Sequence, residues 1–152
     1  MLGRNSYISM AQLWKILLPL YSDNTFMETM TYSSAKTLET EHLTWLKHLT
    51  FYKAQLQVME SEISDFVKSK PPKLLMPKVE QFQNQFIRQR EVIDELRHKV
   101  KAHENEIERM TNFALEYLRD RVTREHVVIK DEYKRFLELF LTLEQDFHDF
   151  IA

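Results

Sequence analysis

Histidine and acidic side chains are the groups in this chain with the chemistry to bind a metal ion or to move a proton. The 152-residue sequence has six histidines, 23 acidic residues and no cysteine, which excludes thiolate nucleophiles, disulfides and cysteine-held metals. His42 and His103 stand out because each falls on an otherwise apolar stripe of a helical sequence pattern. A histidine on such a stripe faces the interior of a helical bundle, where imidazole and carboxylate groups bind metals in some proteins.

The spacing of the chain brings these two histidines together. Folding the first two helical segments back on one another at 71–77 places His42 opposite His103 and Glu104. Folding a third segment onto the second brings further acidic and phenolic side chains toward His103. One hypothesis is therefore a metal or small-ligand site between the helices. Its candidate ligands are His42, His103, Glu104 and Glu132, with Glu41 and Tyr133 as further participants.

The interpretation favoured by the sequence is structural. Buried polar layers fix the register of packed helices, and Gln89 lies on the same stripe as His103. Glu95-x-x-His98 has the spacing of one half of a di-iron ligand set, but such a bundle needs two of these motifs and two more glutamates. Glu95 also lies beside the apolar stripe and not on it, so we expect no bound cofactor.

Catalysis is not favoured either. Most acidic residues lie on charged outer faces, where surrounding water keeps a carboxyl pKa ordinary. No serine or threonine is paired with a histidine in a known motif, and the single glycine, Gly3, excludes a glycine-rich phosphate loop. We therefore expect a protein that is not an enzyme.

The charge pattern does not favour nucleic acid or a membrane span. The formal net charge is -2 and the pI about 6.3, without the excess of positive charge that tracks phosphates. The most apolar N-terminal segment, 10–21, is too short to cross a bilayer and contains Lys15 and Pro19. Basic residues of the second helix alternate with acidic ones. The basic ones are Arg88, Arg90, Arg97, Lys99 and Lys101.

The element that must position His103 is a long helix expected over 77–110. Apolar residues recur there in alternating steps of three and four, which is typical of a helix that packs against partner helices. A helix of this length cannot bury its stripe alone, so the rest of the chain must supply partners. The stripe consists of Val79, Phe82, Phe86, Ile93, Leu96, Val100, Ile107 and Met110.

Two further helices supply these partners. The first is expected over 37–70 with Thr37 as its cap, and prolines at 71, 72 and 77 end it. Residues 111–122 break the stripe and are expected to form a helical corner or a kinked continuation. Thr123 then caps a third helix that carries His126 on its own stripe. The predicted fold is all-α, an antiparallel three-helix bundle with coiled-coil-like packing over 37–152.

Residues 1–36 are expected to be a separate leader and linker, partly disordered or with a short helix. Lys15 interrupts its apolar segment and no clear cleavage site follows, so a cytoplasmic protein is favoured over an exported one. A natural start at Met27 or Met30 and membrane-surface association through 14–20 are alternatives that the sequence leaves open.

The end of the third helix predicts self-association. Its last fifteen residues carry four acids and no lysine or arginine, so the apolar face must hold this end in place. Leu139 and Leu141 extend that face beyond one stripe, and either the leader around Trp14 and Leu17 or a second copy of the chain covers it. The second option predicts a homodimer through the third helix.

Several short motifs carry a resemblance to a known group of proteins. They are Glu41-His42-x-x-Trp45-Leu46, Phe51-Tyr52-Lys53, Phe82-Gln83-Asn84-Gln85-Phe86-Ile87 and Asp94-Glu95-Leu96-Arg97-His98. With them, the segment 37–152 resembles small uncharacterised bacterial helical-bundle proteins. The resemblance implies a bacterial, cytoplasmic bundle and no activity or cofactor. Together these patterns predict a non-enzymatic interaction or scaffold protein.

Overall fold

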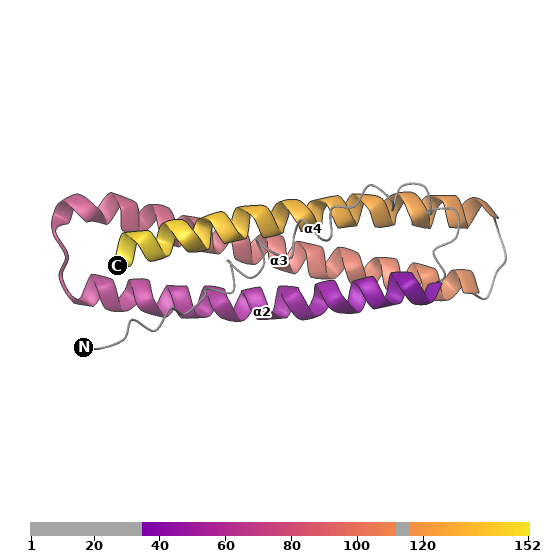
Figure 1. Ribbon diagram of the computed structural model, residues 1–152, viewed down its shortest axis with the longest axis horizontal. Helices are drawn as coiled ribbons and strands as arrows, with labels where there is room; N and C mark the ends of the chain where they lie inside the picture. The colour runs from indigo at the N-terminus through magenta and orange to yellow at the C-terminus, as the bar shows by residue number, and fades with distance from the viewer. Residues whose placement is uncertain (1–34, 112–115) are drawn as a thin grey trace, which may run out of the picture. The chain divides into compact units, whose positions relative to one another are not determined.

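The computed structural model describes residues 35–111 and 116–152. Three long helices occupy these ranges: α2 (Ala35–Lys68), α3 (Met76–Thr111) and α4 (Glu116–Ile151), with a short 3₁₀ turn, η3 (Lys73–Leu75), before α3. They belong to one compact unit, Ser34–Ala152, in which every pair of helices is in contact. Figure 1 shows the three helices side by side, with each running opposite to the one before it. The predicted all-α antiparallel three-helix bundle is confirmed.

The connection between α2 and α3 follows from its prolines and from one unusual backbone angle. Lys70 has a φ of 57°, the left-handed conformation that commonly ends a helix, and its amide N–H donates to the carbonyl of Val67. Pro71 and Pro72 follow and cannot continue a helix, because they lack the N–H that helical hydrogen bonds need. Pro77 lies in the first turn of α3, where that missing N–H is tolerated.

The third helix begins earlier than the sequence indicates. α4 starts at Glu116, so Thr123 lies two turns inside it and not at its cap. Thr37 likewise lies inside α2, which starts at Ala35. Only residues 112–115 of the predicted corner lie outside the described helices. The stripe is broken at 111–122, but helical backbone hydrogen bonds do not require an apolar stripe.

A single hydrophobic core runs along most of the bundle, and its residues come from all three helices. Ten of the largest apolar side chains in it are less than 4% exposed, as expected for the interdigitated interior of a helical bundle. They are Trp45, Leu49, Leu56, Ile63, Phe82, Phe86, Ile93, Phe136, Phe140 and Phe147.

The core is divided near one end by a polar layer. His42 of α2, His103 of α3 and His126 of α4 lie there, and we call these three residues the histidine layer. Beyond it a second group of buried residues, the end cluster, consists of Leu38, Ile107 and Val122. Each end-cluster residue is four positions, about one helical turn, from the histidine on its own helix.

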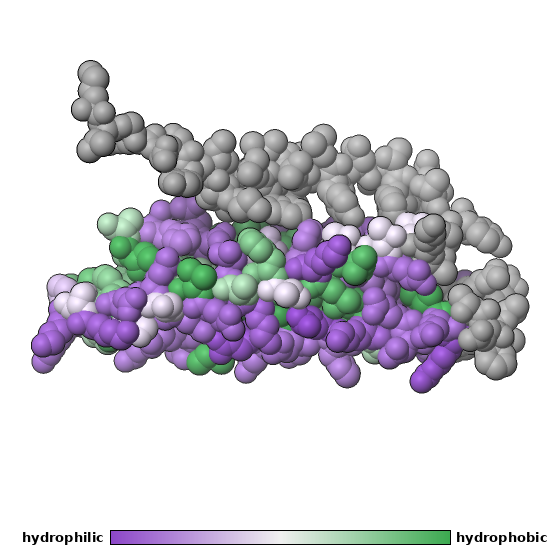
Figure 2. Space-filling model, turned by 90° about the horizontal axis from the view of Figure 1, so that it is seen from below, coloured by the Kyte–Doolittle hydropathy of each residue, from purple (hydrophilic) through white to green (hydrophobic). Residues whose placement is uncertain are grey.

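The outer faces are mainly hydrophilic, as Figure 2 shows for one side of the bundle. Within the described ranges, no helix is both long enough and apolar enough to cross a membrane. The apolar α4 residues singled out above differ in their environment, since Leu141 is buried and Leu139 is 55% exposed.

Candidate metal centre

Three ring nitrogens converge at the centre of the histidine layer. His42 Nε2 lies 3.0 Å from His103 Nδ1 and 3.2 Å from His126 Nδ1. The three ring centroids form a nearly equilateral triangle with sides of 4.9, 5.2 and 5.5 Å. The rings are 0%, 3% and 1% exposed in the order His42, His103, His126. Each helix therefore contributes one imidazole to one enclosed point.

The outer nitrogens of two of these rings are held by acceptors. His103 Nε2–H donates to the carbonyl of Val122 at 2.8 Å, and a carbonyl oxygen only accepts. His126 Nε2–H donates to the carboxylate of Glu41 at 2.6 Å. The other oxygen of Glu41 accepts from Lys130 Nζ at 3.1 Å. A neutral ring that carries its proton on Nε2 presents the lone pair of its inner Nδ1 to His42.

Without a cation at its centre, the layer cannot satisfy the hydrogen-bonding needs of all its buried ring nitrogens. If His42 carries its proton on Nε2, that single N–H points at two acceptors, 3.0 and 3.2 Å away, and cannot fully satisfy both. If the proton is on Nδ1, three lone pairs face one another. His42 Nδ1 is itself buried and has no hydrogen-bond partner among the described residues. Either arrangement leaves buried polar atoms unsatisfied, which is costly.

Burial favours the uncharged forms of His42 and His103. It lowers the pKa of His42 to about 4, with the neighbouring His103 and His126 acting in the same direction. Burial also lowers the pKa of His103, although the hydrogen bond to Val122 opposes that shift. Burial raises the pKa of Glu41, but hydrogen bonds from His126 and Lys130 lower it by more, so this carboxylate stays ionised. Neutral imidazole is the form that binds metals.

Aromatic rings close the layer on the side of the main core. Trp45 stacks on His126 at 5.0 Å between centroids and on Tyr133 at 5.5 Å. Tyr133 is hydrogen-bonded to His48. The expectation that Tyr133 approaches His103 is wrong, because Tyr133 lies two helical turns beyond His126, and it is His126 that reaches His103.

The acidic residues predicted as ligands do not join the histidines. The group of side chains whose ligand atoms lie within 4.8 Å of one another consists of His42, His103 and His126, without Glu104 or Glu132. Glu132 accepts two hydrogen bonds from Lys99 Nζ, and Glu104 is half-buried on α3. Glu41 is the one predicted carboxylate that reaches the layer, and it does so by holding His126.

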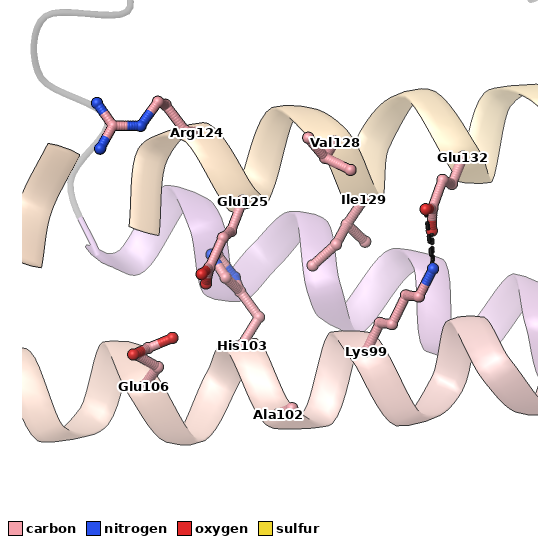
Figure 3. A pocket seen from close by; sticks show the side chains of 9 residues that line it. All are labelled: Lys99, Ala102, His103, Glu106, Arg124, Glu125, Val128, Ile129 and Glu132. Atoms are coloured by element: carbon pink, nitrogen blue, oxygen red, sulfur yellow. Dashed lines mark hydrogen bonds and ion pairs between the residues drawn. The ribbon is translucent and has the colours of Figure 1, made fainter. Parts of the chain in front are cut away.

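A surface groove of about 370 Å³ between α3 and α4 runs past His103. Figure 3 shows the carboxylates of Glu106 and Glu125 on the same side of His103, with the Lys99–Glu132 ion pair farther along on the other side. Arg121 pairs with both Glu106 and Glu125. The acidic groups beside His103 are therefore already matched by an arginine.

The sequence pointed to two of the three histidines. A hairpin of two helices places His42 and His103 opposite each other, and the structure brings them into contact. The sequence pattern places His126 on the stripe of the third helix but does not identify it as a partner of the other two. The sequence signal that could have identified His126 is its position on that stripe. The register of the third helix could not be fixed across 111–122.

Comparison of the chain with protein-family profiles, with curated proteins and with solved structures found no match.

Proposed function

We propose that this protein is a metal-binding helical bundle in which His42, His103 and His126 bind one divalent transition-metal ion. The observation that carries the proposal is the convergence of three buried ring nitrogens, one from each helix. In a tetrahedral zinc site with Zn–N bonds of about 2.0–2.1 Å, ligand nitrogens are about 3.3 Å apart. The two nitrogen separations at His42, 3.0 and 3.2 Å, are close to that value.

The outer contacts of the layer support the proposal. Histidines that bind metals commonly donate their second N–H to a carboxylate or a backbone carbonyl, which fixes the ring and leaves the other nitrogen free to bind. His126 has the first kind of partner in Glu41, and His103 has the second in Val122. One proton shared among the three rings can bond well to only one facing lone pair, whereas one metal ion can bind all three ring nitrogens.

The ligand type narrows the choice of ion. Three neutral imidazoles suit zinc, copper, nickel or iron, whereas calcium and magnesium prefer oxygen ligands. Zinc accepts three histidines with a fourth position for water or another donor. We take Zn²⁺ as the probe ion for that reason, and Co²⁺ as its spectroscopic substitute.

Calorimetric titration of the full, untagged chain with Zn²⁺ tests the proposal. We expect one ion bound per chain and loss of that binding in His103→Ala and in His126→Gln. His98→Ala is the matched control, because His98 is an exposed histidine on the same helix as His103. It should bind zinc like the original chain.

Circular dichroism separates a lost site from a lost fold. Should both layer variants unfold, Co²⁺ added to the original chain still gives an answer, because a tetrahedral nitrogen site has intense visible absorption and an octahedral one does not. Absence of zinc binding by the original chain, or equal loss of binding in His98→Ala, would refute the metal site.

A second candidate function is protein binding. Leu43, Phe51 and Val58 are 53%, 38% and 50% exposed, and helical spacing places them on one face of α2. Leu139 on α4 adds another exposed apolar side chain. These residues support the predicted interaction module, which would bind a protein partner or a second copy of the chain.

Sedimentation velocity tests self-association. A homodimer predicts a mass near twice 18.4 kDa that falls toward the monomer value in Leu139→Glu, with Glu138→Gln as a neighbouring exposed control. A monomer at micromolar concentration, unchanged by either substitution, would refute the homodimer.

A further inference from the structure

The histidine layer separates two apolar regions of very different size. The main core lies on one side of the layer, and its buried residues extend along the rest of the bundle. Among the residues whose burial is described, the end cluster on the other side consists of Leu38, Ile107 and Val122, which are all aliphatic. Hydrophobic stabilisation scales with buried area, so the end cluster contributes little to holding the three helix ends together.

The ion pairs described near this end are exposed to water. The ion pairs of Arg121 with Glu106 and Glu125 involve side chains that are 24–44% exposed, and water and salt weaken such pairs. Few buried apolar contacts and exposed ion pairs are typical of segments that open locally while the rest of a protein stays folded. An ion held by the histidine layer would therefore add a contact to all three helices at this end.

The layer is also connected directly to the end cluster. The carbonyl of Val122 holds the ring of His103, and the side chain of the same residue is buried in the end cluster. An ion that fixes the ring of His103 therefore also fixes the backbone of α4 one turn before His126. Opening the end cluster would remove the contact that orients His103.

The enclosure of the site links this end to metal exchange. The three imidazoles are at most 3% exposed, and Trp45 and the main core block the other side. We propose that the bound ion and the end of the bundle around Leu38, Ile107 and Val122 act as one unit: metal binding orders this end, and local opening of this end is the step that releases the metal. This inference rests on the proposed metal site and adds its regulation by local unfolding.

Zinc-release kinetics on the full chain provide the test. The zinc-loaded protein is mixed with an excess of a chromogenic chelator, and the release rate is measured at several chelator concentrations. We expect a rate that does not depend on chelator concentration, because opening precedes release. Val122→Ala should release zinc roughly tenfold faster, since it removes two buried methyl groups from the end cluster. Val128→Ala is the matched control, because Val128 is on the same helix and 57% exposed.

Hydrogen exchange with mass spectrometry locates the opening. Zinc should slow exchange by about tenfold or more in 37–43, 103–109 and 120–127, and leave peptides of the main core unchanged. Should Val122→Ala fail to fold, this comparison on the original chain decides the question alone.

The outcomes separate the two proposals. Zinc that binds with full stoichiometry but changes exchange nowhere, or equally along the whole bundle, overturns the coupling and leaves the metal site intact. Release that rises in proportion to chelator concentration, at equal rates in Val122→Ala and Val128→Ala, also overturns it. Absence of zinc binding in the same samples overturns both.

Discussion

Glu41 connects the charged surface of the bundle to the histidine layer. Its carboxylate accepts from His126 Nε2 and from Lys130 Nζ, and its side chain is only 12% exposed. Glu41→Gln keeps the size of the side chain and removes its charge. We expect zinc affinity to fall by about 10–100-fold, as is usual when the partner of a metal-binding histidine is changed. Calorimetric titration measures this change.

Glu39→Gln is the control for that experiment, because Glu39 is exposed on the same helix. Equal affinities in Glu41→Gln and in the original chain would show that Glu41 does not orient His126 for metal binding.

Tyr52 gives a prediction at high pH. Burial, with a smaller contribution from Glu144, raises the pKa of Tyr52 to about 12. An unfolded tyrosine ionises near pH ~10, so between pH ~10 and ~12 unfolding releases a proton and stability falls as the pH rises. The loss should reach about 2–3 kcal/mol and be smaller in Tyr52→Phe. Urea unfolding at about pH 9 and about pH 11.5 checks this, and the same loss in both proteins would contradict it.

At the residue level, the sequence predicts the contact of His42 with His103, because two helices joined by a short proline-rich connection have one antiparallel register. It does not predict the roles of Glu41 or of the Val122 carbonyl. Any of several carboxylates lies within reach of the stripe, and a backbone carbonyl has no sequence signal. The third histidine depends on the register of α4, which only the folded structure fixes.

At the scale of the helices, Thr123 distinguishes two descriptions of the third helix. In the structure it lies inside α4, which begins at Glu116. Thr123→Pro should therefore destabilise the protein by about 3 kcal/mol or more, because proline in a helix interior removes a hydrogen bond and clashes with the preceding turn. Urea unfolding measures the loss.

Thr123→Ala provides the complement. In a helix interior alanine is as good as threonine or better, whereas loss of a capping threonine costs about 1 kcal/mol. Mild effects of proline together with a clear loss in the alanine variant would restore Thr123 as the start of the helix.

The helices themselves are predictable because apolar residues that recur at spacings of three and four positions define a stripe. Prolines mark where α2 ends. The start of α4 was not predictable in the same way. Between 111 and 122 the stripe is interrupted, and a helix without a stripe looks like a connection when only the apolar pattern is read.

For the whole molecule, the shared core predicts that stability is concentrated along the middle of the bundle. Leu56 is 0% exposed in the centre of α2, so Leu56→Ala should lower the free energy of unfolding by about 2–5 kcal/mol. Leu74→Ala is its control, because Leu74 is 87% exposed, and it should change stability by less than about 0.5 kcal/mol. Similar losses in the two variants would contradict the packing described for the core.

X-ray absorption at the zinc edge, on untagged full-length protein loaded with one equivalent of Zn²⁺, tests the central claim most directly. The geometry predicts a four-coordinate shell with three imidazole nitrogens at about 2.0–2.1 Å. A six-coordinate shell of oxygens, a shell with fewer than three imidazoles, or protein that retains no zinc would contradict it.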